Sequence, residues 1–380
     1  MANKQILIVC GEASGDLNAA NLAKEILKIN SEIKISAVGG SLLRKAGAEV
    51  FYDIKELSVI GFFDVLRKLP EFFRLKRIVL EKIRAEKFDV VVLVDFSGFN
   101  LRLAKEINNQ VPVIYYISPQ VWASRSGRIN SIKKYIRQVV VLFKFEEDFY
   151  RRHGMEVKFA GHPLLDVVSP TIEKEKLLKE LDFSESKNTL ALLPGSRKQE
   201  IEHILPVMLK SASLIAKSKP ELQIVIAKST QVSWEIYRKY TDRFKLNLKI
   251  IEGKTYDCLN IADFALVASG TATLETAIMQ KPFAIVYRMN LLNYLLYRPQ
   301  VRIPYIGMVN IVAQKKIIPE FIQFGARPKK IAAEALKILQ NPSRLEQIKH
   351  GLLEVKNSLG EKGASARAAQ ILLKFLDKAQ

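Results

Sequence analysis

The sequence has little cysteine and histidine, and neither residue is spaced as in a metal site. Its 380 residues contain two cysteines, Cys10 and Cys258, and four scattered histidines. Two cysteines cannot build a disulfide framework, so we expect both in the core of a protein from a reducing compartment. An Asp-x-Asp pair is absent as well. The sequence therefore predicts no metal and no cofactor.

Long apolar runs and two well-known glycine fingerprints are also missing. No stretch approaches the length needed to span a bilayer. The N-terminal apolar run is only a strand long before the loop "CGEASGD" ends it, which is not the pattern of a signal peptide. Neither G-x-G-x-x-G nor a Walker loop occurs, which argues against a nicotinamide dehydrogenase. We expect a soluble, cytoplasmic protein.

Positive charge is abundant. Lys and Arg number 59 against 39 Asp and Glu, a formal net charge of +20. This balance favours anionic partners, which include nucleic acid, phosphorylated small molecules and an acidic membrane face. Nucleic acid is the weaker interpretation, because the basic residues are spread along the chain and the aromatic residues form no stacking platform.

Strand-like runs alternate with helical patterns along the chain, which is typical of parallel βαβ units. A charged, proline-containing stretch from Pro163 to Lys187 separates two such series. We expect an α/β protein with two doubly wound Rossmann-like domains that face each other across a cleft. The predicted parts are residues 1–165, 166–345 and a helical tail, 346–380. The predicted strands are 5–10, 34–39, 88–95, 112–118, 138–143, 157–161, 189–196, 222–228, 248–252, 264–270 and 283–288.

The first strand ends in a loop of small and polar residues. Gly11 and Gly15 would let the backbone pass close to a ligand, and Ser14 and Asp16 lie near the start of a helix. On the loop alone, the structural interpretation is the better one: a tight turn with Asp16 as the helix cap.

Two loops of the second series suit an anion more strongly. Gly195, Ser196 and Arg197 stand between a strand and a helix, where backbone N–H groups and a guanidinium match phosphate oxygens. A second strand-to-helix loop repeats the pattern, and an acid in its helix could accept hydrogen bonds from a ribose. Together the two loops predict a nucleotide-diphosphate site. The second loop contributes Ser269, Gly270, Thr271, Thr273 and, in the first helical turn, Glu275.

Asp95 ends the apolar run "FDVVVLVD", which reads as a strand buried on both faces. A carboxylate has no structural use there. In an open α/β sheet, however, this end of the strand borders the binding crevice. The sequence therefore favours a chemical role for Asp95.

One segment, residues 57–87, combines apolar bulk with Lys and Arg. Before Pro70 its apolar residues run nearly all round a helix, which a surface helix should not show. It fits an interfacial element on anionic lipid or a holder of acyl chains, whereas Leu75 to Leu80 reads as an ordinary core helix. The apolar residues are Ile60, Phe62, Phe63, Val65, Leu66, Leu69, Phe72 and Phe73.

Seven motifs together closely resemble the lipid-A-disaccharide synthase family, nearly end to end and in order. They are "GEASGD", "DFSGFN", "YYISPQVWAS", "GHPLLD", "LLPGSRKQEI", "ASGTATLE" and "GMVNIVAQKKIIPEFIQ". The resemblance implies an inverting, metal-independent glycosyltransferase of the GT-B class. It would join UDP-2,3-diacylglucosamine to the 6-hydroxyl of 2,3-diacylglucosamine 1-phosphate, releasing UDP. It also implies a peripheral enzyme of the inner membrane of Gram-negative bacteria, and a tail that can swap in a homodimer.

The resemblance assigns roles to individual residues. It implies that Asp95 is the general base that deprotonates the acceptor hydroxyl. Two positions depart from the family pattern, Gly98, where an acid is common, and Ser124, where a tryptophan is common. The implied acceptor-side residues are Glu12, Ser14 and Asn100, and the implied UDP-side residues are Arg197, Ser269, Gly270, Thr271, Glu275, Asn310, Glu320 and Gln323.

Two other hypotheses stay open at this point. Another UDP-sugar enzyme of the same fold, such as a UDP-N-acetylglucosamine epimerase or a lipid-linked transferase, would keep the UDP loops. A non-enzymatic, basic membrane- or RNA-binding protein would explain the charge. It would leave Asp95, Arg197 and Glu275 without a role.

Replacing Phe62 and Phe63 by Ser tests the apolar, basic segment. We expect weaker binding to liposomes or detergent micelles, because the variant loses the apolar bulk that enters the lipid. UDP binding should survive. Equal loss of lipid binding and of UDP binding would mean that Phe62 and Phe63 belong to the core.

Overall fold

The structure is a computed structural model that describes residues 4–57, 69–123, 127–297 and 303–378. The chain forms two compact units, residues 1–166 with 359–380 and residues 167–358. Of the apolar, basic segment, Ile60, Phe62, Phe63, Val65 and Leu66 lie outside the described residues, as does Ser124.

The first unit is built on a parallel sheet of seven strands in its described part, in the order β3-β2-β1-β4-β5-β6-β7. The strands are β1 (Gln5–Val9), β2 (Lys34–Gly39), β3 (Glu49–Asp53), β4 (Val90–Val94), β5 (Val113–Tyr116), β6 (Gln138–Val141) and β7 (Lys158–Phe159). The helices are α1 (Ala13–Ile29), α2 (Ser41–Lys45), the 3-10 turn η1 (Ile54–Leu57), α4 (Leu69–Ala85), α5 (Ser97–Ile107), α6 (Arg128–Tyr135), α7 (Lys144–Arg152), α8 (Leu164–Val167, at the boundary) and α18 (Ala364–Lys378).

The described residues of the second unit repeat this plan with six parallel strands in the order β10-β9-β8-β11-β12-β13. The strands are β8 (Thr189–Leu193), β9 (Gln223–Lys228), β10 (Leu248–Glu252), β11 (Phe264–Ala268), β12 (Phe283–Tyr287) and β13 (Glu320–Ile322). The helices are α9 (Lys174–Glu180), α10 (Lys198–Ser218), α11 (Trp234–Thr241), α12 (Thr255–Ile261), α13 (Thr271–Ile278), α14 (Leu291–Tyr297), α15 (Met308–Ala313), the 3-10 turn η3 (Gln323–Gly325), α16 (Pro328–Leu339) and α17 (Pro342–Ser358).

The central strands are buried along their whole length, as continuous apolar runs covered by helices on both faces require. Every residue of β4, β8 and β11 is buried. Both cysteines lie in this core, as predicted, and burial raises the pKa of the Cys258 thiol to about 12. The prediction missed β3 and β13, which are edge strands with few fully buried residues.

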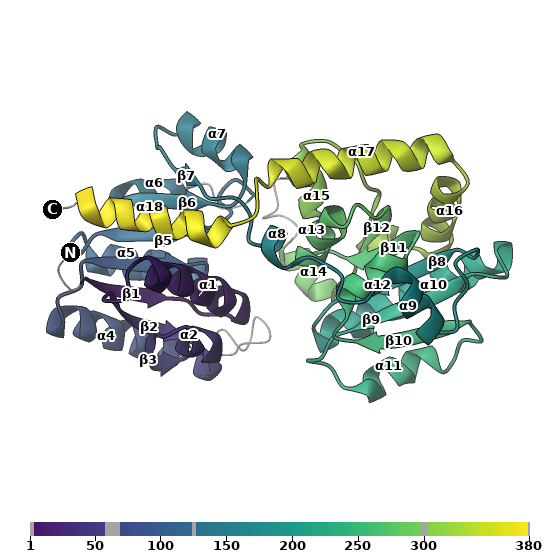
Figure 1. Cartoon of the computed structure of the whole chain (residues 1–380), viewed down its shortest axis with the longest axis horizontal. Coiled ribbons are helices and arrows are strands. Elements are labelled where there is room, and N and C mark those ends of the chain that lie inside the picture. The colour runs from purple at the N-terminus through teal and green to yellow at the C-terminus, as the bar shows by residue number, and fades with distance from the viewer. Residues whose placement is uncertain (1–3, 58–68, 124–126, 298–302, 379–380) are drawn as a thin grey trace. The chain divides into compact units, whose positions relative to one another are not determined.

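The last helix of the chain belongs to the first unit, where α18 packs on α1 (Figure 1). The Arg367 guanidinium donates to the carbonyls of Ala160, Glu361 and Lys362, and Asp166 accepts from the Gly363 N–H. These bonds fasten the returning chain to the end of β7. The predicted boundary at residue 345 falls inside α17, which stays whole in the second unit because it packs on α13 and α15.

Asp16 has a different structural role from the one the loop suggested. It lies inside α1, whose N-cap is Glu12, and it is buried. Its carboxylate accepts hydrogen bonds from the N–H groups of Gly40 at 2.7 Å, Leu42 at 3.1 Å and Leu43 at 3.3 Å. Asp16 therefore caps α2, which follows the neighbouring strand, and so joins the first two βα loops.

Replacing Asp16 by Ala should destabilise the first unit. The change leaves buried N–H donors unpaired at a cost of about 2–3 kcal/mol, a fall of roughly 5–10 °C in melting temperature by calorimetry. Asp148→Ala is the matched control, because that carboxylate pairs only with exposed Arg151 and should cost less than about 0.5 kcal/mol. Equal melting temperatures for both variants would contradict this role.

Candidate functional site

Each sheet reverses its strand order at one point, and the loops singled out in the sequence lie at these points. In the first unit the reversal falls between β1 and β4, and in the second between β8 and β11. Ligands of open α/β sheets bind at the carboxyl ends of the strands at such a switch point. The loops after β1 and β4, and those after β8 and β11, are therefore the expected binding edges of the two units.

Asp95 follows β4 in an unusual backbone conformation. Asp95 and Phe96 both have a φ of 50°, a left-handed conformation that is uncommon for residues other than glycine. The Asp95 carbonyl accepts from the Tyr115 hydroxyl at 2.7 Å and from the Asn100 amide at 2.8 Å. Its N–H donates to the Tyr116 carbonyl at 3.2 Å. Three hydrogen bonds thus fix the backbone of Asp95.

The environment of the Asp95 side chain raises its pKa. Burial is the main cause, and the negative charge of Glu12 adds to it, while a hydrogen bond from the Phe96 N–H opposes both. A carboxylate that is harder to keep ionised is a stronger base once it is ionised, which suits proton abstraction.

An aromatic cluster of Phe72, Phe96 and Phe99 lies beside Asp95. The Phe96 and Phe99 rings stack with centroids 5.1 Å apart, and the Phe72 ring lies 5.9 Å from Phe96. A Cβ at Gly11 would lie 2.3 Å from the Phe96 ring, so only glycine leaves room for it. This contact joins the loops after β1 and β4. The sequence placed Phe72 in the apolar, basic segment but did not predict its contact with the loop of Asp95.

The predicted acceptor-side residues do not all reach the surface. Glu12 and Ser14 are exposed at the start of α1. Asn100 is fully buried, and its amide donates to the backbone of Asp95, so it positions the loop. Gly98 is exposed, and a Cβ there would meet open space.

The motifs "SPQVWA" and "GHPLLD" contribute Trp122 and His162, which pack near buried Glu146 and the Phe143 ring. Glu146 accepts from the Trp122 indole at 3.0 Å and from the Phe143 N–H at 3.1 Å, and burial raises its pKa to about 7. His162 packs against the Phe143 ring, and burial lowers its pKa to about 4. These contacts give Trp122 and His162 a structural role.

In the second unit, a carboxylate of the protein itself occupies the loop after β8. Glu200 accepts from the N–H groups of Ser196 at 2.9 Å and Arg197 at 3.3 Å, and it approaches the Arg197 guanidinium at 3.9 Å. The prediction took these N–H groups to be free; Glu200 of the same helix occupies them. Gly195 is required here, because its φ is 111° and a Cβ would collide with Glu200. The loop therefore binds a carboxylate in the way it would bind a phosphate.

The loop after β11 leaves its small residues open. Gly270 and Thr271 are exposed, and a Cβ at Gly270 would meet open space. Glu275 lies in the second turn of α13 rather than the first. Burial raises the pKa of the Glu275 carboxyl, and the Tyr256 hydroxyl donates to it at 3.0 Å. Tyr256 is a residue that sequence reasoning missed.

Four predicted UDP-side residues make their hydrogen bonds within the protein. Asn310 bonds the backbone of Ile317 and Ile318. Glu320 accepts from the N–H groups of Ile306 and Gly307. The Ile306 carbonyl in turn accepts from Ser269 at 3.4 Å, so this network supports the loop after β11. The Gln323 side chain forms hydrogen bonds with the N–H and the carbonyl of Met289. The Thr273 hydroxyl donates to the Gly270 carbonyl.

Among the described residues, no group of three or more His, Cys, Asp or Glu side chains could hold a metal ion.

The two parallel, Rossmann-like sheets are those of the GT-B fold. CalG4, the calicheamicin glycosyltransferase, has a TM-score of 0.63 at 15% identity, covering 100% of this chain and 99% of that chain. MurG of Acinetobacter baumannii has a TM-score of 0.56 at 14% identity, covering 98% and 99%. At these identities the likeness concerns the fold alone.

The sequence comparisons are more specific. The family model of lipid-A-disaccharide synthetase matches residues 6–375. A lipid-A-disaccharide synthase of Syntrophus aciditrophicus is 40% identical over 381 residues, which cover 100% of this chain and 99% of that protein. The chain belongs to the lipid-A-disaccharide synthetase family.

Proposed function

We propose that the protein is a lipid-A-disaccharide synthase. It transfers 2,3-diacylglucosamine from UDP-2,3-diacylglucosamine to the 6-hydroxyl of 2,3-diacylglucosamine 1-phosphate, with inversion at the anomeric carbon. The products are the β-1,6 disaccharide 1-phosphate and UDP. The observation that carries the proposal is the family match over residues 6–375.

Asp95 is the base in this proposal. The acceptor hydroxyl is a poor nucleophile, and the Asp95 carboxylate takes its proton as the oxygen attacks the anomeric carbon. The bond from that carbon to the UDP oxygen breaks at the same time, and the electron pair leaves with UDP. The raised pKa of Asp95 and its place at the switch point support this role. Exposed Glu12 and Ser14 contact the acceptor, and buried Asn100 positions Asp95.

The second unit holds the donor. The diphosphate displaces the Glu200 carboxylate from the N–H groups after β8, and Arg197 with the loop after β11 stabilises the charge that develops on it. This arrangement supports catalysis without a metal. Glu275 accepts hydrogen bonds from the ribose, as acids near such loops do. Asn310, Glu320 and Gln323 hold the surrounding loops in place.

We place the protein at the cytoplasmic face of the inner membrane, on anionic lipid. Among the described residues, no helix is long and apolar enough to cross a membrane. Of the predicted lipid-contacting residues, Leu69 and Phe72 are half-buried and Phe73 is exposed, with Lys76 over its ring at 5.7 Å. Apolar side chains beside a cation support contact with lipid or acyl chains. A homodimer in which the tails swap stays a prediction.

Turnover by purified protein tests the reaction and the base together. With both substrates present, the parent should release UDP and form the disaccharide. Turnover by Asp95→Ala should be slower by about 10²-fold or more, because the acceptor hydroxyl loses its base. Circular dichroism of both proteins checks that they are folded.

Asp89→Ala is the matched control, because Asp89 precedes the opposite end of the same strand and bonds Lys4 and Gln5. It should turn over like the parent. Unchanged turnover in Asp95→Ala would discard the base but keep the reaction. No turnover by folded parent that still binds UDP would indicate another UDP-sugar enzyme.

A further inference from the structure

The second unit carries a group of exposed apolar side chains that the proposed reaction does not use. On α14, Leu291, Leu292 and Leu295 are 49%, 58% and 59% exposed. Phe324, on η3, is 64% exposed. Side chains spaced three and four residues apart lie on one face of a helix, so the leucines form a single apolar strip. A scattered exposed leucine is ordinary, whereas a group of this kind marks a binding surface.

Contacts between α14 and η3 join these side chains into one surface. The Tyr294 and Phe324 rings meet edge to face with centroids 6.2 Å apart. Both backbone groups of Met289, just before α14, are bonded to the Gln323 side chain in η3. The two apolar elements are therefore fixed to one another. We call Leu291, Leu292, Leu295 and Phe324 the α14 surface.

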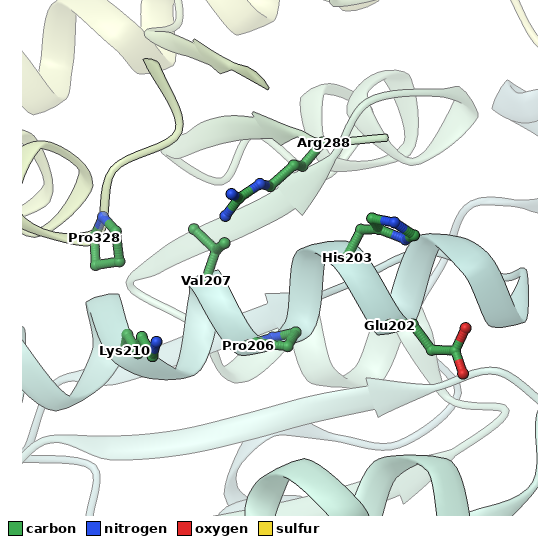
Figure 2. A pocket seen from close by; sticks show the side chains of 7 residues that line it. All are labelled: Glu202, His203, Pro206, Val207, Lys210, Arg288 and Pro328. Carbon is green, nitrogen blue, oxygen red and sulfur yellow. The ribbon is translucent and has the colours of Figure 1, made fainter. Parts of the chain in front are cut away.

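Basic groups border the α14 surface. Arg288 is three residues before Leu291, and the Arg327 guanidinium donates to the Phe324 carbonyl at 3.2 Å. Arg288 also lines a pocket of about 300 Å³ with His203, Lys210 and Pro328. Figure 2 shows the Arg288 guanidinium over α10 near Val207, while the carboxylate of Glu202 points away from it.

Glu202 also lines this pocket, but among the described residues the two cations pair with no carboxylate. Within the described part of the chain, neither Arg288 nor Lys210 forms an ion pair. Two unpaired cations at a concave site attract an anion such as a phosphate group. A protein-binding surface would have a core depleted of charge and a polar rim. Apolar side chains beside two unpaired cations match an anionic lipid surface better.

We propose that the second unit has a membrane-binding surface of its own. The leucines of α14 and Phe324 enter the boundary between lipid headgroups and acyl chains, and the pocket of Arg288 and Lys210 takes a lipid phosphate. It belongs to the second unit, whereas the apolar, basic segment belongs to the first. The proposal does not depend on the identity of the reaction, because it concerns lipid of the bilayer and not a substrate.

Vesicle binding by the purified full chain tests the proposal. The vesicles contain phosphatidylcholine alone or with added phosphatidylglycerol, and binding is measured by co-sedimentation. Leu291→Ser/Leu292→Ser/Leu295→Ser should bind the anionic vesicles about tenfold more weakly or worse. Lys210→Ala/Arg288→Ala should lose binding to the anionic vesicles only, and high salt should remove the difference from the parent.

Two matched controls lie elsewhere in the same unit. Leu353→Ser removes an exposed leucine of α17, and Lys245→Ala/Lys249→Ala removes two exposed charges near β10. Both should bind vesicles like the parent. All variants should bind UDP and turn over detergent-dispersed substrates within a factor of about two, as expected of distant surface changes.

Three results would overturn the proposal. Parent-like vesicle binding by both test variants would mean that this surface does not meet lipid. A leucine variant with unchanged vesicle binding and slower turnover would show that α14 holds the acyl chains of a substrate. Loss of UDP binding in Lys210→Ala/Arg288→Ala would assign the pocket to the nucleotide site. Failure of the reaction itself would appear in the parent and would leave the vesicle comparison intact.

Discussion

The left-handed turn at Asp95 and Phe96 is the constraint on which the first unit's site depends. Two consecutive residues other than glycine adopt this conformation, at a cost of roughly 1–3 kcal/mol each. Such a turn persists only if its surroundings fix it. Buried Asn100 and the Tyr115 hydroxyl both bond the Asp95 carbonyl, and the Phe96 ring lies over Gly11. These contacts fix the backbone at Asp95 and join it to the first loop and to the aromatic cluster.

In the second unit, hydrogen bonds within the protein fix the loops of the site. Glu200 fills the anion site after β8, and Glu320 with Asn310 holds the loop that supports Ser269. Donors that are already aimed at an anion need little rearrangement when a diphosphate replaces the carboxylate. Both units therefore place preformed loops at their switch points, where we propose proton transfer in the first unit and binding of the leaving group in the second.

The sequence predicted the fold well because buried parallel strands are continuous apolar runs, visible without neighbours. The sequence did not predict β3 and β13, because these two short, half-buried strands lack such runs. Asp95 could be found because a carboxylate ends an apolar strand, and Arg197 could be found because a guanidinium stands at the start of a helix. The sequence could not predict the hydrogen-bond partners of Asp16, Asn100 and Glu275. Bonds such as that from Gly40 to Asp16, or from Tyr256 to Glu275, depend on tertiary packing. The sequence did not predict the α14 surface, because a helix of seven residues is too short to show a clear periodicity.

The pH–rate profile of the parent and of Glu12→Gln tests the role of Asp95 most directly. Activity should fall as the pH drops through the pKa of the base, because only the carboxylate accepts a proton. The charge of Glu12 raises the pKa of Asp95, so its removal should stabilise the ionised form. At saturating substrates, the account predicts that the acid limb of Glu12→Gln moves to lower pH. Glu147→Gln, an exposed change on α7, should leave it in place. An acid limb that does not move in Glu12→Gln, or that moves to higher pH, would contradict Asp95 as the base.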